Sequence, residues 1–197
     1  MIEPETHCPV NEQQIELNEE RKDFVLPPWR VLQILTTALD TLVEEDFLSD
    51  DFDYMEMIRR RGIRLKPYSA FSLEHLKKLR KMSLSFWKEG LCLAVTDEKQ
   101  GQCRMIAYND KVSDEIKLAI IMHEFGHIVL KHTQQCEQGE AEALCFATVM
   151  ITALSFKPSL SAGNESEKPG GRDFLQGILI SYIRNKQREI KIKKNEA

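Results

Sequence analysis

The most informative segment of this chain reads Leu118-Ala119-Ile120-Ile121-Met122-His123-Glu124-Phe125-Gly126-His127-Ile128-Val129-Leu130. Its apolar residues surround a helix on nearly every side, and a helix of that kind is buried. Ser113 precedes it as a candidate N-cap, followed by Asp114 and Glu115, whose negative charges suit the start of a helix. The sequence therefore predicts a buried central helix from Ser113 to about His132.

Within this helix, His123 and His127 have HExxH spacing. Residues four apart lie on one helix face, with Cβ atoms about 5–6 Å apart, so two imidazoles can bind one zinc ion. Glu124 could hold the metal's water and take its proton as a general base. The alternative is two core histidines and a buried glutamate, each needing its own partner. A metal would satisfy all three groups at once, which favours the metal site.

A catalytic zinc site usually has a third protein ligand. The metzincin pattern HExxHxxGxxH would require Gly at 130 and His at 133, but the chain has Leu130 and Thr133. His132 stands one residue short, on another face, and is expected to be a capping or surface histidine. The third ligand should therefore come from elsewhere in the chain.

The next predicted helix, from about Glu137 to Ser155, offers carboxylates. His127 lies ~7.5 Å from the end of the first helix, and Glu142 lies ~7.5 Å from the start of the second, so the two would stand level in an antiparallel pair. Glu142 heads an apolar stripe made of Cys145, Phe146, Val149 and Met150. A carboxylate there should point inward and need a cation. Glu142 is favoured as third ligand; Glu140, on a weaker stripe, is the alternative.

The flanking sequence predicts the remaining organisation. Residues 1–24 form a flexible acidic arm, 25–156 the main domain, 157–171 a linker, and 172–197 a C-terminal helix with a basic end. The elements expected in the domain are helices from Pro28 to about Leu48, Asp51 to Arg61 and Phe71 to Met82, an edge strand Ile63 to Tyr68, and a hairpin of strands 91–96 and 104–108.

Composition excludes several classes of protein. The 197 residues are 42% hydrophobic and 29% charged with a net charge of −4, which is a globular balance. A polybasic nucleic-acid or membrane binder is not expected. The five cysteines include no CxxC pair, so neither a disulfide framework nor an all-cysteine zinc site is predicted. With no apolar run of ~20 residues and no secretory signal at the start, we expect a cytoplasmic protein.

Several stretches together resemble the ImmA/IrrE family of metallopeptidases. They are Tyr108-Asn109 before the central helix, His123-Glu124-Phe125-Gly126-His127 for the family's HExGH, and Glu142-Ala143-Leu144-Cys145-Phe146-Ala147 for its EAxxFA. The resemblance covers roughly residues 30 to 155. It implies His123, His127 and Glu142 as zinc ligands and Glu124 as the catalytic acid/base. The family often continues with Leu-Leu-x-Pro, whereas this chain has no proline until Pro158.

The expected fold is α+β and zincin-like, with a small, mostly antiparallel sheet packed on the HExxH helix and flanking helices. Well-known members of the family cut helix-turn-helix repressors, which implies a zinc endopeptidase relieving repression of stress or mobile-element genes. Tyr108 is a candidate oxyanion donor, and the strand Arg104 to Tyr108 could pair with an extended substrate. The alternative is a non-catalytic metal-binding regulatory module that holds a protein partner. Neither a membrane nor direct nucleic-acid binding is expected, and the oligomeric state is left open.

Overall fold

The computed structural model describes residues 25–81, 89–97, 101–134 and 136–161, together with 181–182, 185–186 and 188. The described elements are five α-helices, three strands and a short 3-10 helix (Tyr68–Ala70). The helices and strands are α1 (Pro28–Glu44), α2 (Tyr54–Arg60), β1 (Ile63–Pro67), α3 (Leu73–Arg80), β2 (Gly90–Asp97), β3 (Gly101–Tyr108), α4 (Asp114–Val129) and α5 (Glu137–Ser161). The α+β class expected from the sequence is confirmed.

Local signals set most helix ends. Helix α1 begins directly after Pro27 with a second proline in its first turn, where the missing N–H costs no hydrogen bond. The Asp53 carboxylate accepts from the backbone N–H groups of Met55 and Glu56 at the start of α2. Gly62 follows α2 with φ of 73°, the left-handed conformation that glycine adopts without strain.

The sheet has the strand order β1-β3-β2. Strands β2 and β3 form the predicted antiparallel hairpin, whereas β1 pairs with β3 in parallel, with Ile63 opposite Arg104 and Pro67 opposite Tyr108. The sheet is therefore mixed. It also corrects the predicted role of residues 104–108, because β3 is the central strand and both of its edges are already paired over that stretch.

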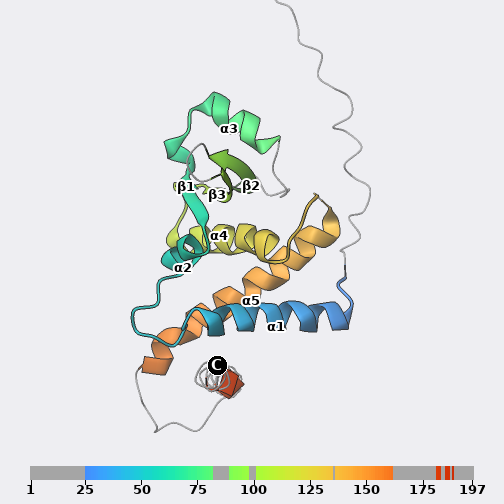
Figure 1. The fold of residues 1–197 in the computed structure, drawn as a ribbon, viewed down its shortest axis with the longest axis vertical. Helices are drawn as coiled ribbons and strands as arrows, with labels where there is room; N and C mark the ends of the chain where they lie inside the picture. Colours follow the sequence, from blue (N-terminus) through green and yellow to red (C-terminus); the bar gives the residue numbers. More distant parts are fainter. Residues whose placement is uncertain are drawn as a thin grey trace, which may run out of the picture.

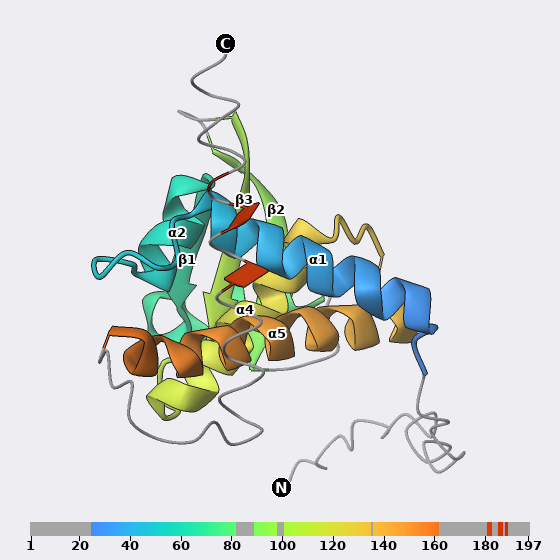
Figure 2. The ribbon, with the colours of Figure 1, turned by 90° about the horizontal axis from the view of Figure 1, so that it is seen from below.

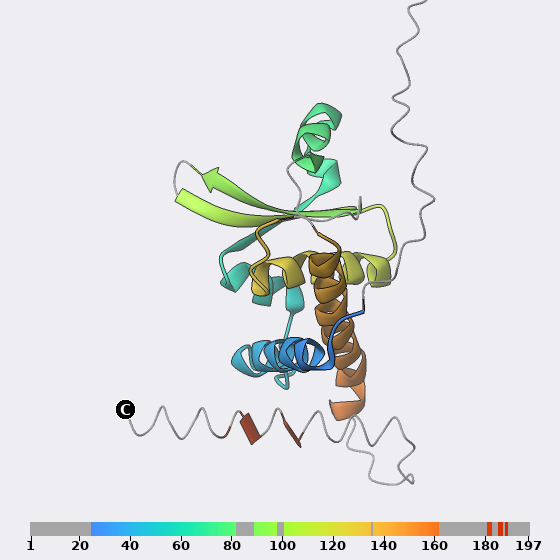
Figure 3. The same ribbon diagram turned by 90° about the vertical axis from the view of Figure 1, so that its right-hand side faces the viewer.

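The two faces of the sheet bury different helices. Leu91, Leu93 and Met105 point to one face, where they cluster with side chains of α3. Cys92 and Ile106 point to the opposite face and join the main core with α4. This alternation follows from the two-residue period of a strand. Figure 1 shows the result, with α3 above the sheet and α4 beneath it, and Figure 3 shows the β2–β3 hairpin lying over α4.

Helices α5 and α1 complete the domain on the side of α4 away from the sheet. Helix α5 packs against both α4 and α1, and Figure 2 shows α1 lying beside α5. The largest fully buried side chains come from four helices, the sheet and the turn after α1, and they include Phe47, Phe125, Phe146, Ile34, Leu42, Met57 and Ile106. The metal-ligand candidates thus lie in a helix that is covered on two sides.

Several boundaries differ from the sequence prediction; α1, for example, ends at Glu44 and not near Leu48. Helix α5 continues to Ser161, five residues into the segment 157–171 that was predicted as a linker. Most of the predicted C-terminal helix lies outside the described residues, as does the arm 1–24. Tyr182, which is described, packs on the main core and donates a hydrogen bond to Asp40 over 3.5 Å. Within the described part of the chain, every helix is too short or too polar to cross a membrane.

Candidate metal centre

Helix α4 carries both candidate imidazoles into the interior. The Ser113 hydroxyl accepts from the backbone N–H of Ile116 at the start of this helix, as predicted. His123 and His127 are 4% and 1% exposed, and their Nε2 atoms lie 3.2 Å apart. The four-residue spacing therefore brings the two rings together as the sequence predicts.

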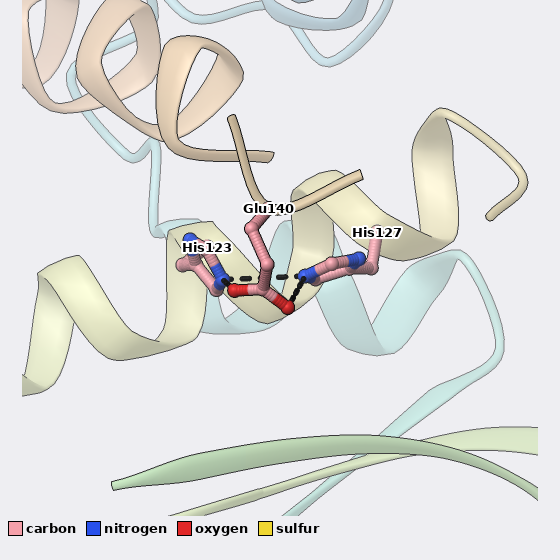
Figure 4. Close-up of side chains that lie close together, drawn as sticks. All are labelled: His123, His127 and Glu140. Atoms are coloured by element: carbon pink, nitrogen blue, oxygen red, sulfur yellow. Dashed lines mark hydrogen bonds and ion pairs between the residues drawn. The ribbon is translucent and has the colours of Figure 1, made fainter. Parts of the chain in front are cut away.

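The third side chain beside them is Glu140, from the first turn of α5 (Figure 4). Its carboxylate lies 3.2 Å from His123 Nε2 through Oε2 and 3.5 Å from His127 Nε2 through Oε1. These three residues form a group whose ligand atoms all lie within 4.8 Å of one another. Glu140 thus closes a triangle of donors over the helix face that carries the histidines.

The spacing of the His123, His127 and Glu140 donors fits a small tetrahedral ion. Two ligand atoms bound at 2.0–2.1 Å in tetrahedral geometry are roughly 3.3 to 3.4 Å apart. The two Nε2 atoms are 3.2 Å apart, close to that value, and each has a different Glu140 oxygen nearby, Oε2 at 3.2 Å from His123 and Oε1 at 3.5 Å from His127. Two imidazoles and one carboxylate also match a donor set of catalytic zinc sites that keep a position open for water or substrate. The group could therefore hold a metal ion.

The structure does not place Glu142, favoured by the sequence as third ligand, beside the two Nε2 atoms, and its role as a ligand stays a prediction. It is buried, as the apolar stripe predicted, at 2% exposure. The cation that it meets is the Arg30 guanidinium of α1, through Nε at 2.9 Å and through a second, shorter bond from Nη2. This ion pair and a hydrogen bond from Gln138 hold the pKa of the Glu142 carboxyl at about 2. The stripe correctly predicted burial and the need for a cation, but the cation belongs to α1.

The packing of α5 on α4 explains why Glu140 faces the histidines. A Cβ atom on Gly126 would lie 3.1 Å from the carbonyl oxygen of Ala143 and 3.2 Å from its Cα, so the two backbones approach closely there. Ala143 and Ala147 are buried small residues, and Glu140 is one turn before Ala143 on the same face. Ala143 therefore faces α4 together with Phe146, while Glu142 turns toward Arg30 of α1.

Glu124 is fully buried beneath the start of β2. A Cβ atom on Gly90 would come within 2.8 Å of Glu124 Oε1, so only glycine leaves room for this carboxylate. On the same strand, the Cys92 thiol lies against it. Burial, the negative charge of Glu124 and a hydrogen bond with Glu124 all raise the pKa of Cys92. The predicted base thus lies against an edge strand of the sheet.

His127 is held as a neutral imidazole. Its burial lowers its pKa to about 4, and the neighbouring His123 ring adds to the effect while Glu140 opposes it. The neutral ring is the form that can bind a metal ion.

Tyr108, the candidate oxyanion donor, does not join this group. It ends β3, packs partly buried against the main core, and lies near Tyr54 at the beginning of α2 and Lys117 in α4. A strand-end aromatic side chain in the core is the ordinary outcome for such a residue.

Sequence reasoning missed Arg30 and misplaced His132. Arg30 lies 112 residues from its partner Glu142, beyond the reach of any local pattern. His132, expected as a cap or surface residue, is only 11% exposed in its side chain and contacts both His127 and Glu142. The sequence feature that could have indicated this position is Glu142, because a buried carboxylate can accept a hydrogen bond from an imidazole as well as bind a metal.

Comparison of this chain with protein-family models, with curated proteins and with solved structures finds no match.

Proposed function

We propose that this protein is a zinc-dependent endopeptidase whose metal is held by His123, His127 and Glu140. The observation that carries the proposal is the convergence of two imidazole Nε2 atoms and one carboxylate at tetrahedral spacing, with Glu124 next to the first ligand in the chain. The resemblance to the ImmA/IrrE family supports the same chemistry. It assigned the carboxylate to Glu142, and the proposal moves that role to Glu140.

In this proposal the site residues have two separate roles, metal binding and proton transfer. His123, His127 and Glu140 would hold the ion, and a bound zinc supplies Lewis acidity that polarises a carbonyl and lowers the pKa of bound water to about 7. Glu124 would accept a proton from the attacking water and pass it to the leaving amine. The Glu124 carboxylate is buried under β2 and so is kept away from bulk water. In such a water-excluded site its charge acts more strongly than it would in water.

The edge of the sheet supports a binding mode for an extended peptide. Among the described strands β2 is an edge strand, and its residues Gly90 and Cys92 lie against Glu124. A substrate strand added to this edge would pair through its backbone and run past the base. Strand β3, the original candidate, is excluded by its central position.

A protein substrate, and in particular a helix-turn-helix repressor, belongs to the proposal through the family resemblance alone. The test is to co-express this chain with the repressor-type proteins encoded beside its gene and to look for fragments by mass spectrometry. Wild-type protein should give defined fragments, and Glu124→Gln should bind zinc but give none. The matched control is Glu137→Gln on the exposed first turn of α5, which should cleave as wild type does.

Metal analysis decides the ligand set independently of any substrate. Glu140→Ala should lower zinc affinity at least a hundredfold, and Glu137→Ala should leave it unchanged. If the wild-type protein binds about one zinc ion per chain but fragments form equally with Glu124→Gln, the non-catalytic regulatory module becomes the better interpretation.

A further inference from the structure

His132 bridges the candidate metal ligand His127 and the buried carboxylate of Glu142. Its Nδ1 lies 2.9 Å from His127 Nδ1, and its Nε2 lies 3.1 Å from Glu142 Oε2. The two imidazole rings meet edge to face with centroids 4.9 Å apart. These contacts lie on the side of His127 opposite to Nε2, the atom that faces His123 and Glu140.

The end of α4 is built to place this ring. Lys131 has φ of 59°, a left-handed conformation, directly after the C-cap Leu130. The N–H of His132 donates to the carbonyl of His127 over 3.0 Å, and the N–H of Lys131 donates to that of Ile128 over 3.1 Å. This pair of bonds is the Schellman motif, which turns the chain sharply back on the helix. The turn returns His132 to the helix that it has just left.

The protons in this chain of contacts can be assigned from acceptor chemistry. The Glu142 carboxylate can only accept, so His132 Nε2 must carry a hydrogen and donate it. A neutral His132 ring then has an unprotonated Nδ1, which accepts from His127 Nδ1–H. His127 in that tautomer has its lone pair on Nε2, the atom turned toward His123 and Glu140. With His132 neutral, the hydrogen positions on both rings thus follow from the carboxylate of Glu142.

We infer that His132 and Glu142, held by Arg30, are positioning residues that fix His127 in the tautomer and orientation needed to bind the metal. The inference rests on the proposed metal site. Histidine ligands of metals commonly donate their second N–H to a carboxylate or carbonyl, and loss of such a partner costs 10- to 100-fold in metal affinity. Here an imidazole is placed between the ligand and the carboxylate.

We call the chain of hydrogen bonds from Glu142 through His132 to His127 the relay. Arg30 and Gln138 keep Glu142 in the ionised form that the relay needs. The guanidinium donates two hydrogen bonds to the carboxylate, and Gln138 Nε2 donates a third over 2.8 Å. Glu142 therefore remains an anion that is fixed in place. In this inference Glu142, which the sequence favours as a ligand, acts on the metal site through His132 and His127 and is not itself a ligand.

The first experiment measures cobalt(II) binding from its visible absorption, with zinc by competition. His132→Leu should bind 10- to 100-fold more weakly than wild type. His132→Gln should recover much of the loss, because its amide oxygen can accept from His127 Nδ1–H. His75→Leu, an exposed histidine on α3, is the matched control and should bind as wild type does. Binding by His132→Leu within twofold of wild type, or a loss that His132→Gln does not reduce, would overturn the inference.

The second experiment is independent of metal binding. Nitrogen-15 NMR of the imidazole rings in chelator-treated protein at pH 7.5 should show His127 of the wild type as the Nδ1–H tautomer. In His132→Leu it should shift toward Nε2–H. A wild-type protein that shows this tautomer but binds no metal would remove the proposed function and keep the relay. An Nε2–H tautomer in the wild type would remove the relay even if metal binds.

Discussion

Gly126 on α4 faces the backbone of Ala143 on α5 so closely that a Cβ atom on residue 126 would lie 3.1 Å from the Ala143 carbonyl oxygen. The same atom would lie 3.2 Å from Cδ1 of Phe146. Gly126 stands between the two histidines in sequence, and Ala143 lies one turn after Glu140. The contact therefore links the helix that carries the imidazoles to the helix that carries the carboxylate.

Gly126→Ala should accordingly separate the helices by a few tenths of an ångström. We expect a loss of about 1–3 kcal/mol in the free energy of unfolding, as for other overpacked contacts, and weaker zinc binding because Glu140 moves with α5. The control is Gly139→Ala, where the new Cβ would meet Cys136 Sγ at an ordinary 3.4 Å. That helix position should be neutral or gain up to about 1 kcal/mol. Urea denaturation measures both, and equal effects of the two substitutions would contradict this account.

Low pH should lower the free energy of unfolding of the metal-free protein because His127 becomes protonated. Its pKa is about 4 in the folded protein and about 6.5 in the unfolded chain, so the unfolded chain binds the proton more tightly. The stability that the neutral ring contributes is fully present above pH 6.5 and is lost as the pH falls through 4, with a size on the order of 1–3 kcal/mol. Urea unfolding in chelator across this range should show a steeper decline for wild type than for His127→Gln. Parallel curves would assign the acid sensitivity to other groups.

The Arg30–Glu142 pair should be strongly coupled because the carboxylate is buried. Arg30→Met leaves that charge without its cation and should cost about 1–3 kcal/mol in stability. The double variant Arg30→Met/Glu142→Leu should recover part of this cost, since it removes the stranded charge. The exposed pair Glu74–Lys78 on α3, 2.9 Å apart, is the control, and Lys78→Met should change stability by less than about 0.5 kcal/mol. If Arg30→Met costs no more than Lys78→Met, the pair is not coupled as described.

Gly90 should matter for Glu124 more than for the metal. A Cβ atom there would lie 2.7 Å from Ile120 Cγ2 and 2.8 Å from Glu124 Oε1. Gly90→Ala should therefore displace the carboxylate, lower stability by about 1–3 kcal/mol and reduce cleavage, while zinc affinity changes only a few-fold. Gly62→Ala is the control. Nothing lies within 4 Å of its Cβ, so its cost of about 1 kcal/mol comes from the left-handed backbone alone and cleavage should not change.

Much of the local structure followed from short-range rules. Ser113 caps α4 as predicted, and residues 91–96 and 104–108 form the predicted antiparallel hairpin. The pairing of His123 with His127 also followed, because four-residue spacing fixes their separation whatever the rest of the chain does. These features depend on residues within about one or two turns of each other, so the sequence alone was enough to predict them.

The strand order, and the choice of the carboxylate that lies beside the two histidines, depended on contacts between residues far apart in the sequence. A stripe of apolar residues shows that a face is buried but not which neighbour buries it, and α5 has two neighbours, α4 and α1. The small side chains of Gly126 and Ala143 let one face of α5 approach α4 and so brought Glu140 to the histidines. The guanidinium of Arg30 met Glu142 on the other face. Sequence periodicity determined which side chains point inward, and tertiary packing decided which partner each one meets.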